Sequence, residues 1–223
     1  MTDIGIRARY SLDMLKAHQV YKNAAGKRVP GVTTVLGILD KPALLAWANR
    51  MGLEGKDINA VRDAAADIGT IAHARIEAHL RGMDFDETGL STEALDKSAT
   101  SFLRFLEWWD RSNLSVEATE VQMVSELWQV GGTADIVALR GDRRILVDIK
   151  TGKGIYREHR MQVAAYARMY EHVGRGRMDE VWIVRVGKED ADDIEPVEIT
   201  NRARCEEAFA AVLGAYRALQ AVK

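Results

Sequence analysis

The sequence contains a single cysteine, Cys205, among its 223 residues. One cysteine excludes an internal disulfide, and it excludes any metal or iron–sulfur site built from four cysteines. Cys205 follows several helix-forming residues near the C-terminus, so we expect it to be a small packed side chain. The lack of disulfides fits a reducing cytoplasm.

Proline is also scarce, with three residues, and no apolar run approaches the roughly 18 residues that a membrane-spanning helix needs. The first residues lack the apolar core of a secretory signal. Hydrophobic residues make up 47% and charged residues 29%, as in ordinary globular proteins. Without a linker-like stretch, we expect one domain over residues 1–223 and no membrane span.

The chain has no large excess of either charge, because its formal net charge is −2. Composition alone therefore does not indicate a nucleic-acid-binding protein. Positive charge is nevertheless concentrated between Arg140 and Arg160, where seven Lys or Arg residues stand against three acidic residues. A basic stripe of this kind attracts a phosphate backbone.

Hydrophobic periodicity predicts five helices and five strands. The turn-forming residues 23–27 predict a small hairpin within the segment 8–36. The pattern predicts an α/β (α+β) fold with a mostly antiparallel sheet and helices around it. The expected helices cover residues 40–52, 58–82, 92–112, 157–173 and 201–221, and the expected strands cover residues 116–128, 130–140, 143–150, 181–186 and 195–199.

Gly141-Asp142 is a good two-residue hairpin turn. It predicts a register in which the numbers of paired residues add up to 283. Asp135 and Asp148 then lie directly opposite each other, with Cβ atoms about 5 Å apart. Lys150 follows Asp148 by two residues and points to the same face of the sheet.

Two directly opposed carboxylates repel each other unless something offsets their charge. A divalent cation bound between Asp135 and Asp148 would do so, and a neighbouring lysine could position a water or stabilise a phosphate. These parts suit metal-assisted phosphodiester hydrolysis. The alternative is an ordinary surface hairpin with scattered charges, although aspartate is disfavoured inside strands.

Two pairs of polar residues at helical spacing accompany the hairpin. His73 and Glu77 are four residues apart, so the imidazole could complete a ligand set while Glu77 orients it. Gln162 and Tyr166 have the same spacing on the helix after Lys150 and could contact phosphate, water or a base. Either pair could instead be structural. Glu120, on the preceding strand, could belong to the site or be exposed.

Four motifs in this order resemble the RecB-type branch of the PD-(D/E)XK nuclease superfamily, over roughly residues 65–170. The segment Val-Pro-Gly-Val-Thr-Thr at residues 29–34 is similar to the opening of phage-encoded members and of the related mitochondrial genome maintenance exonuclease. The motifs are Gly-Thr-x-x-His-x-x-x-Glu at 69–77, Gly-x-x-Asp at 132–135, Asp-x-Lys-Thr at 148–151 and Gln-x-x-x-Tyr at 162–166.

The resemblance implies a restriction-endonuclease-like core at residues 65–170, in which a central mixed sheet with an active-site hairpin is flanked by helices. A hairpin and helix extension at residues 1–57 precedes this core. It also implies roles for individual residues. The catalytic Mg²⁺ or Mn²⁺ would be bound by His73, Asp135, Asp148 and the Ile149 carbonyl. Lys150 would handle the nucleophilic water, and Gln162 and Tyr166 would support the site and the DNA strand.

The expected activity is that of a metal-dependent DNA exonuclease that leaves a 5′-phosphate and a 3′-hydroxyl, in DNA end processing, recombination or phage replication. Its expected surroundings are the cytoplasm of a bacterium or a phage-infected host, with a recombination or single-strand-binding protein as a conceivable partner. We expect the DNA groove to be lined by Lys153, Arg157 and Arg160.

The chain departs from some relatives, because its single cysteine excludes their iron–sulfur cluster. It also lacks a phosphate-loop motif, so we expect no ATP use. The alternative functions are a structure-selective DNA endonuclease and a non-catalytic DNA-binding subunit on a nuclease fold. The oligomeric state stays open.

Overall fold

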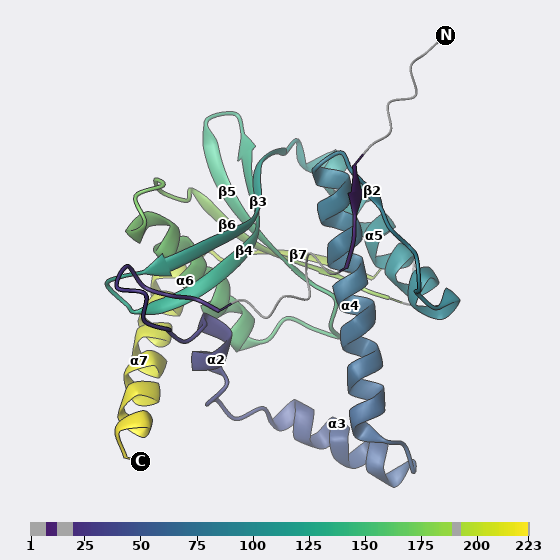
Figure 1. Ribbon diagram of the computed structural model, residues 1–223, viewed down its shortest axis with the longest axis horizontal. Helices are drawn as coiled ribbons and strands as arrows, with labels where there is room; N and C mark the ends of the chain where they lie inside the picture. Colours follow the sequence, from purple (N-terminus) through teal and green to yellow (C-terminus); the bar gives the residue numbers. More distant parts are fainter. Residues whose placement is uncertain (1–7, 13–19, 189–192, 223) are drawn as a thin grey trace.

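A five-stranded sheet forms the centre of the molecule in the computed structural model, which describes residues 8–12, 20–188 and 193–222 (Figure 1). Neighbouring strands are antiparallel except for the parallel central pair β5 and β6. This confirms the predicted mixed, mostly antiparallel sheet. In spatial order the strands are β3 (Ser115–Ser125), β4 (Val130–Arg140), β5 (Arg143–Lys150), β6 (Glu180–Val186) and β7 (Ile194–Glu198).

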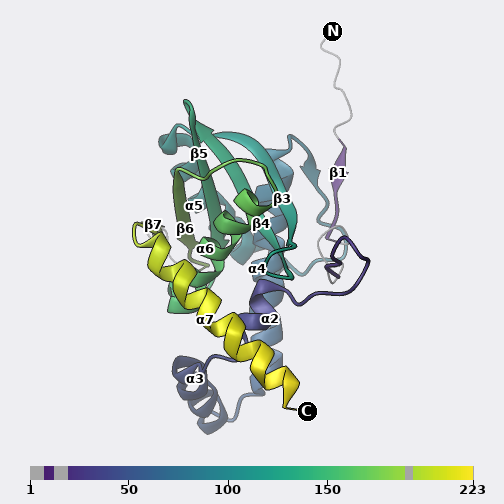
Figure 2. The same ribbon diagram turned by 90° about the vertical axis from the view of Figure 1, so that its left-hand side faces the viewer.

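Helices cover both faces of the sheet, as the views in Figures 1 and 2 show. The long helices α4 (Ile58–Leu80) and α5 (Thr92–Ser112) pack on one face. The other face is covered by α2 (Val32–Leu36), α6 (Arg157–His172) and α7 (Arg202–Ala221). Helix α3 (Pro42–Leu53) begins at its proline, and α6 is the crossover between β5 and β6.

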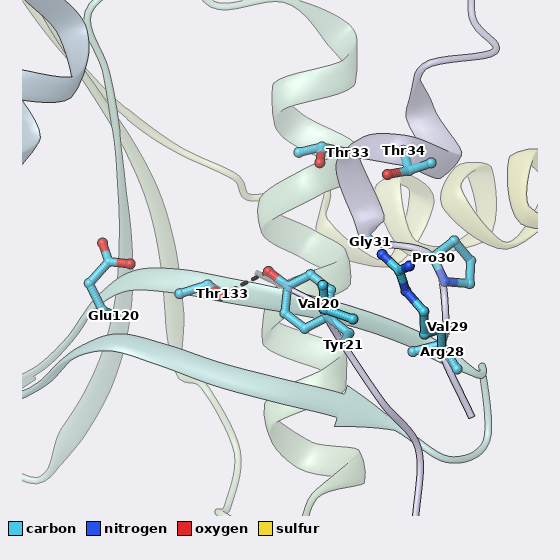
Figure 3. Close-up of a pocket in the computed structure, with 10 residues that line it drawn as sticks. All are labelled: Val20, Tyr21, Arg28, Val29, Pro30, Gly31, Thr33, Thr34, Glu120 and Thr133. Carbon is cyan, nitrogen blue, oxygen red and sulfur yellow. Dashed lines mark hydrogen bonds between the residues drawn. The ribbon is translucent and has the colours of Figure 1, made fainter. Parts of the chain in front are cut away.

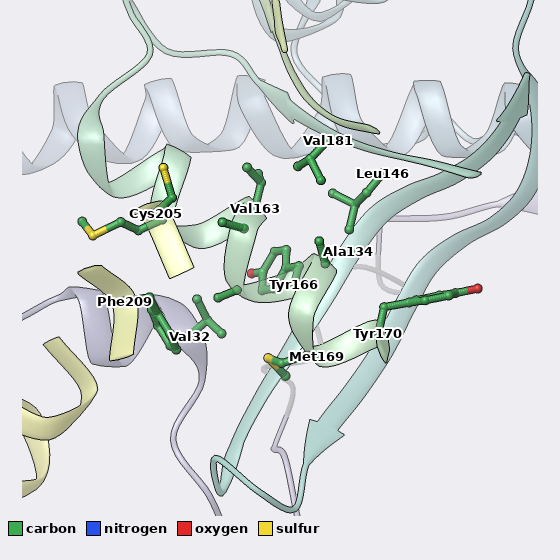
Figure 4. Close-up of a cluster of buried hydrophobic side chains, with 14 of the residues drawn as sticks. Val32, Ala134, Leu146, Val163, Tyr166, Met169, Tyr170, Val181, Cys205 and Phe209 are labelled. Atoms are coloured by element: carbon green, nitrogen blue, oxygen red, sulfur yellow. The ribbon is translucent and has the colours of Figure 1, made fainter. Parts of the chain in front are cut away.

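Alternation along β5 divides its side chains between the two layers. Val147 and Ile149 are buried on the side of α4 and α5, whereas Leu146 packs with Tyr166 and other residues on the side of α6 (Figure 4). Successive strand residues point to opposite faces. Asp148 therefore shares the face of Leu146 and points toward α6.

The N-terminal part contains both confirmed and unexpected elements. Lys22 pairs with Arg28 around the predicted turn, which confirms the hairpin. Helix α2 and the parallel pair of β1 (Arg9–Tyr10) with β2 (Asp84–Phe85) were not predicted, because segments of two to five residues are too short to show a period. Part of the expected N-terminal segment, residues 13–19, lies outside the described residues.

The predicted helices and strands are confirmed, most of them with ends within two residues of those expected. Helix α4 begins where the Asp57 carboxylate accepts hydrogen bonds from the Asn59 and Ala60 amides. In the described ranges, no helix is long and apolar enough to cross a membrane.

Candidate active site

The hairpin of β4 and β5 has the predicted register up to the point where the site begins. Arg140 pairs with Arg143, and Ile136 pairs with Val147, but the ladder ends at that second pair. Beyond it, the Ile149 amide donates a hydrogen bond to Asp135 Oδ2 at 2.8 Å. Asp135 and Asp148, which were expected to face each other, are thus the next residues after the last hydrogen-bonded pair. There the Asp135 side chain, instead of a main-chain carbonyl, accepts the hydrogen bond from β5.

Asp148 is a fully buried carboxylate. Its Oδ2 lies 2.5 Å from Lys150 Nζ, but neither oxygen has a hydrogen-bond partner of normal geometry among the described residues. Burial and the nearby Asp135 raise the pKa of Asp148 to about 6, against the lowering effect of Lys150. The site thus contains a buried negative charge that the protein only partly compensates.

Lys150 is the cation next to these carboxylates. Burial works to lower its pKa, but Asp148 and Asp135 outweigh burial, so the pKa of Lys150 is raised above its usual value. The lysine is therefore an ammonium group at neutral pH. It can donate hydrogen bonds and stabilise negative charge, but it cannot accept a proton from water.

His73 approaches the same carboxylates from α4. Its Nδ1 lies 3.6 Å from Asp135 Oδ2. Burial and the charge of Lys150 lower the pKa of His73 to about 4, although Asp148 and the Ile149 carbonyl act in the opposite direction. At neutral pH the imidazole is therefore uncharged, which is the form that binds metal ions.

Glu77 does not orient His73 as expected, because no hydrogen bond joins the two among the described residues. Its buried carboxylate instead pairs with Arg81 at 2.5 Å and accepts hydrogen bonds from the Tyr10 hydroxyl and from Thr119. These contacts join α4 to β1 and β3. Glu77 thus holds the framework around the site.

Glu120, which the sequence left undecided, lies at the site. Its backbone has φ +49°, which is rare for a residue other than glycine. Together with His73, Asp135 and Ile149 it lines a cavity of about 10 Å³, which has room for roughly one water or ion. Burial, Asp135 and Glu77 raise the pKa of Glu120 to about 8. An acidic residue on the strand before the hairpin was its only signal in the sequence.

Two glycines allow close contacts between different sequence motifs. A Cβ atom on Gly69 would lie 2.7 Å from Thr151 Oγ1, so α4 can pack against the end of β5 only without a side chain there. A Cβ atom on Gly132 would lie 2.5 Å from the Tyr166 ring. These contacts bring the four sequence motifs together in space.

The α6 side of the site contains the predicted Gln162 and Tyr166, whose side chains are joined by a hydrogen bond of 3.0 Å. Burial first and the charge of Asp148 second raise the pKa of Tyr166, which places its ring near that carboxylate. His159 was missed. Burial and Lys150 lower its pKa to about 4, and the spacing 159, 162, 166 would have assigned it to this helix face.

The predicted basic stripe is not one surface. Arg140 and Arg143 both pair with Glu180, and Arg144 pairs with Glu117. These arginines lie at the hairpin turn, four or five strand residues, or roughly 13–16 Å, from Asp135 and Asp148. Their charges are compensated locally and do not line the site.

The three residues expected to line a DNA groove are also not grouped together. Lys153 is exposed in the loop before α6, and Arg157 donates a hydrogen bond to the Asp40 carbonyl at 3.2 Å. Burial raises the pKa of Cys205 on α7, and the charge of Arg160 acts against this rise, so Arg160 faces α7. Lys153 and Arg157 remain near the end of β5.

The donor set fits a hard divalent cation in its chemistry. It combines two carboxylates, a neutral imidazole and the Ile149 carbonyl, and the incompletely compensated Asp148 favours a cation there. In the part of the chain that the structure describes, no three His, Cys, Asp or Glu side chains form a ready-made metal cage. The Lys150 ammonium lies against Asp148 Oδ2 instead.

The match to a known family covers most of the chain. The model of the PD-(D/E)XK nuclease superfamily matches residues 43–222, well beyond the stretch expected from the motifs. No curated protein sequence matches this chain.

Two solved structures are similar to parts of it. A protein from Eubacterium rectale, provisionally named an exonuclease, is 11% identical with a TM-score of 0.45, over 68% of each chain. The protein SSO0001 is 16% identical with a TM-score of 0.31, over 67% of this chain and 74% of its own. With a family match over residues 43–222, and with its four motifs gathered around one buried carboxylate, the chain belongs to the PD-(D/E)XK nuclease superfamily.

Proposed function

We propose that the protein is a metal-dependent DNA exonuclease that leaves a 5′-phosphate and a 3′-hydroxyl. The observation that carries this proposal is the buried Asp148 carboxylate, which lies against Lys150 and within the influence of Asp135 and His73. Nucleases of this superfamily generally use divalent metals. His73, Asp135, Asp148 and the Ile149 carbonyl would hold Mg²⁺ or Mn²⁺, which would supply electrostatic stabilisation of the phosphate.

The residues of the chain have separate tasks in this proposal. The Lys150 ammonium stabilises the negative charge that develops on the phosphate. Gln162 and Tyr166, joined to each other, position the attacking water and the strand. Water adds to phosphorus and loses a proton to solvent as the bond from phosphorus to O3′ breaks, and the leaving 3′ oxygen takes up a proton. Lys153 and Arg157 contact the DNA backbone.

The first experiment measures degradation of linear and circular DNA, both single- and double-stranded, with Mg²⁺, with Mn²⁺ and with chelator. Lys150→Ala serves as the inactive control. We expect metal-dependent loss of linear DNA only, absent from the variant. Cutting of circles would establish an endonuclease instead. DNA binding without any cutting would establish a non-catalytic DNA-binding protein.

A further inference from the structure

A second and larger cavity, of about 470 Å³, adjoins the small cavity of the site, and Glu120 lines both. Its walls are the segment 20–34, strand β4 and Glu120 of β3. In Figure 3, Glu120 lies at one end, Arg28 and Pro30 lie at the other, and Tyr21 and Thr133 lie between them. None of the residues given a role in hydrolysis lines this cavity.

Hydroxyl groups and one arginine give the cavity its chemical character. Thr33 and Thr34 are exposed on α2, whose other three residues are buried, so the helix presents both hydroxyls to the cavity (Figure 3). The Arg28 guanidinium forms no ion pair with any described residue. A guanidinium that has no carboxylate partner in the described part of the chain, and that lies close to hydroxyl donors, suits a phosphate group.

The cavity is preformed, because segment 20–34 is fixed to β4. The Tyr21 hydroxyl and Thr133 Oγ1 are 2.9 Å apart, and the Gly131 amide donates to the Pro30 carbonyl at 2.9 Å. A Cβ atom on Gly131 would fall 2.0 Å from the Tyr21 side chain, so segment 20–34 and strand β4 are in direct contact at this point. A preformed wall of this kind is typical of ligand sites.

The size of the cavity limits what it can bind. Its volume falls at the lower end of the roughly 300–1,000 Å³ that is usual for sites of small ligands. One unpaired nucleotide fits such a space, whereas a base pair with both of its strands does not. We propose that the cavity binds one unpaired nucleotide of the DNA strand being cut, with Arg28 contacting its phosphate.

This inference rests on the proposed nuclease function and adds a substrate preference to it. A nucleotide bound beside Glu120 lies next to the phosphate held at Asp135 and Asp148. Cleavage then requires at least one unpaired nucleotide beside the scissile bond. The enzyme therefore selects single-stranded or frayed DNA ends over blunt duplex ends.

The test measures binding of a labelled five-nucleotide single strand by fluorescence anisotropy, in chelator, so that no cutting occurs. Arg28→Ala removes the cation, and Thr34→Trp fills the cavity from an exposed position. Arg204→Ala, whose side chain is 83% exposed on α7, is the matched control. We expect the first two variants to weaken binding at least tenfold and the control to bind within twofold of wild type.

Equal binding by all four proteins would overturn the inference, provided that thermal melting shows each variant folded. Steady-state cleavage separates this failure from that of the nuclease proposal. If the wild type cuts single strands and both cavity variants keep its KM, the cavity has no such role. If the wild type cuts no DNA with either metal, but binding still depends on Arg28 and Thr34, the cavity inference stands and the nuclease proposal fails.

Discussion

Gly69 of α4 and Thr151 at the end of β5 are in direct contact, since a Cβ atom on Gly69 would lie 2.7 Å from Thr151 Oγ1. His73 lies one helical turn after Gly69, and Lys150 immediately precedes Thr151. The contact therefore sets the distance between the imidazole of α4 and the charged groups of β5.

Gly69→Ala should lower nuclease activity by roughly 10- to 100-fold, because displacements near 1 Å in a catalytic site have effects of that size. Stability should change little, since alanine favours a helix by about 1 kcal/mol over glycine and offsets part of the contact strain. Single-strand degradation rates and thermal melting check both expectations. Gly214→Ala in α7, where a Cβ atom meets no atom within 4 Å, is the control.

A double-mutant cycle with Thr151→Ala identifies the cause. If the lost activity arises from the contact with Oγ1, then Gly69→Ala should have little further effect in a Thr151→Ala background. A full additional loss in that background would show that Gly69 acts in another way.

Tyr166→Phe should reduce kcat roughly tenfold while the protein stays folded. The ring remains packed against Gly132, but the hydrogen bond from Gln162 is lost, along with about 1 kcal/mol of stability. Tyr170→Phe, one turn later on the same helix and equally buried, should keep full activity. Equal kcat values for the two variants would remove Tyr166 from the catalytic machinery.

His159 should make the protein less stable in mild acid. Its pKa is about 4 in the folded chain and near 6.5 when unfolded, so between these values only the unfolded chain takes up the proton. The free energy of unfolding is unaffected by this group above pH 6.5 and falls as the pH drops from 6.5 toward 4. The Tm difference between His159→Gln and wild type should therefore be more positive at pH 5 than at pH 8. An equal Tm difference at pH 5 and at pH 8 would show that His159 does not cause a loss of stability in acid.

Arg202→Ala should lower stability by about 2–3 kcal/mol, or roughly 5–10 °C in Tm. Arg202 joins α7 to α6 through a contact of 2.5 Å with Glu171, and it also pairs with Glu206 of its own helix at 2.5 Å and donates to the Met178 carbonyl. Activity below the melting range should stay unchanged, because these contacts lie away from the site. Arg204→Ala should melt within about 1 °C of wild type, and an equal effect of both variants would contradict the assignment.

The helices and strands were predictable because their hydrophobic periods are long, and the hairpin register was predictable because Gly141-Asp142 fixes it. The gathering of His73 with Asp135 and Asp148 depended on the family resemblance. Spacing alone does not say which helix packs against which strand, and the glycine contacts that decide this are visible only in three dimensions.

Other features escaped prediction for physical reasons. The basic stripe was misleading because partners distant in the sequence, such as Glu180 and Glu117, compensate its arginines. The role of Glu120 depends on a left-handed backbone conformation at one strand position, and a glutamate in the sequence does not predict that conformation. The large cavity depends on the packing of Tyr21 against Gly131, more than a hundred residues apart.

The parallel pairing of β5 with β6 has a consequence for how the protein is made. Asp148 pairs with Ile183 across these strands, and α6, with Gln162 and Tyr166, must form and pack before they can meet. A nascent chain that has emerged from the ribosome only as far as residue 179 already carries every acidic and basic group of the site. Asp148 becomes buried between its neighbouring strands only after β6 has been made, so a chain that ends at residue 179 contains the charged residues of the site without the buried carboxylate.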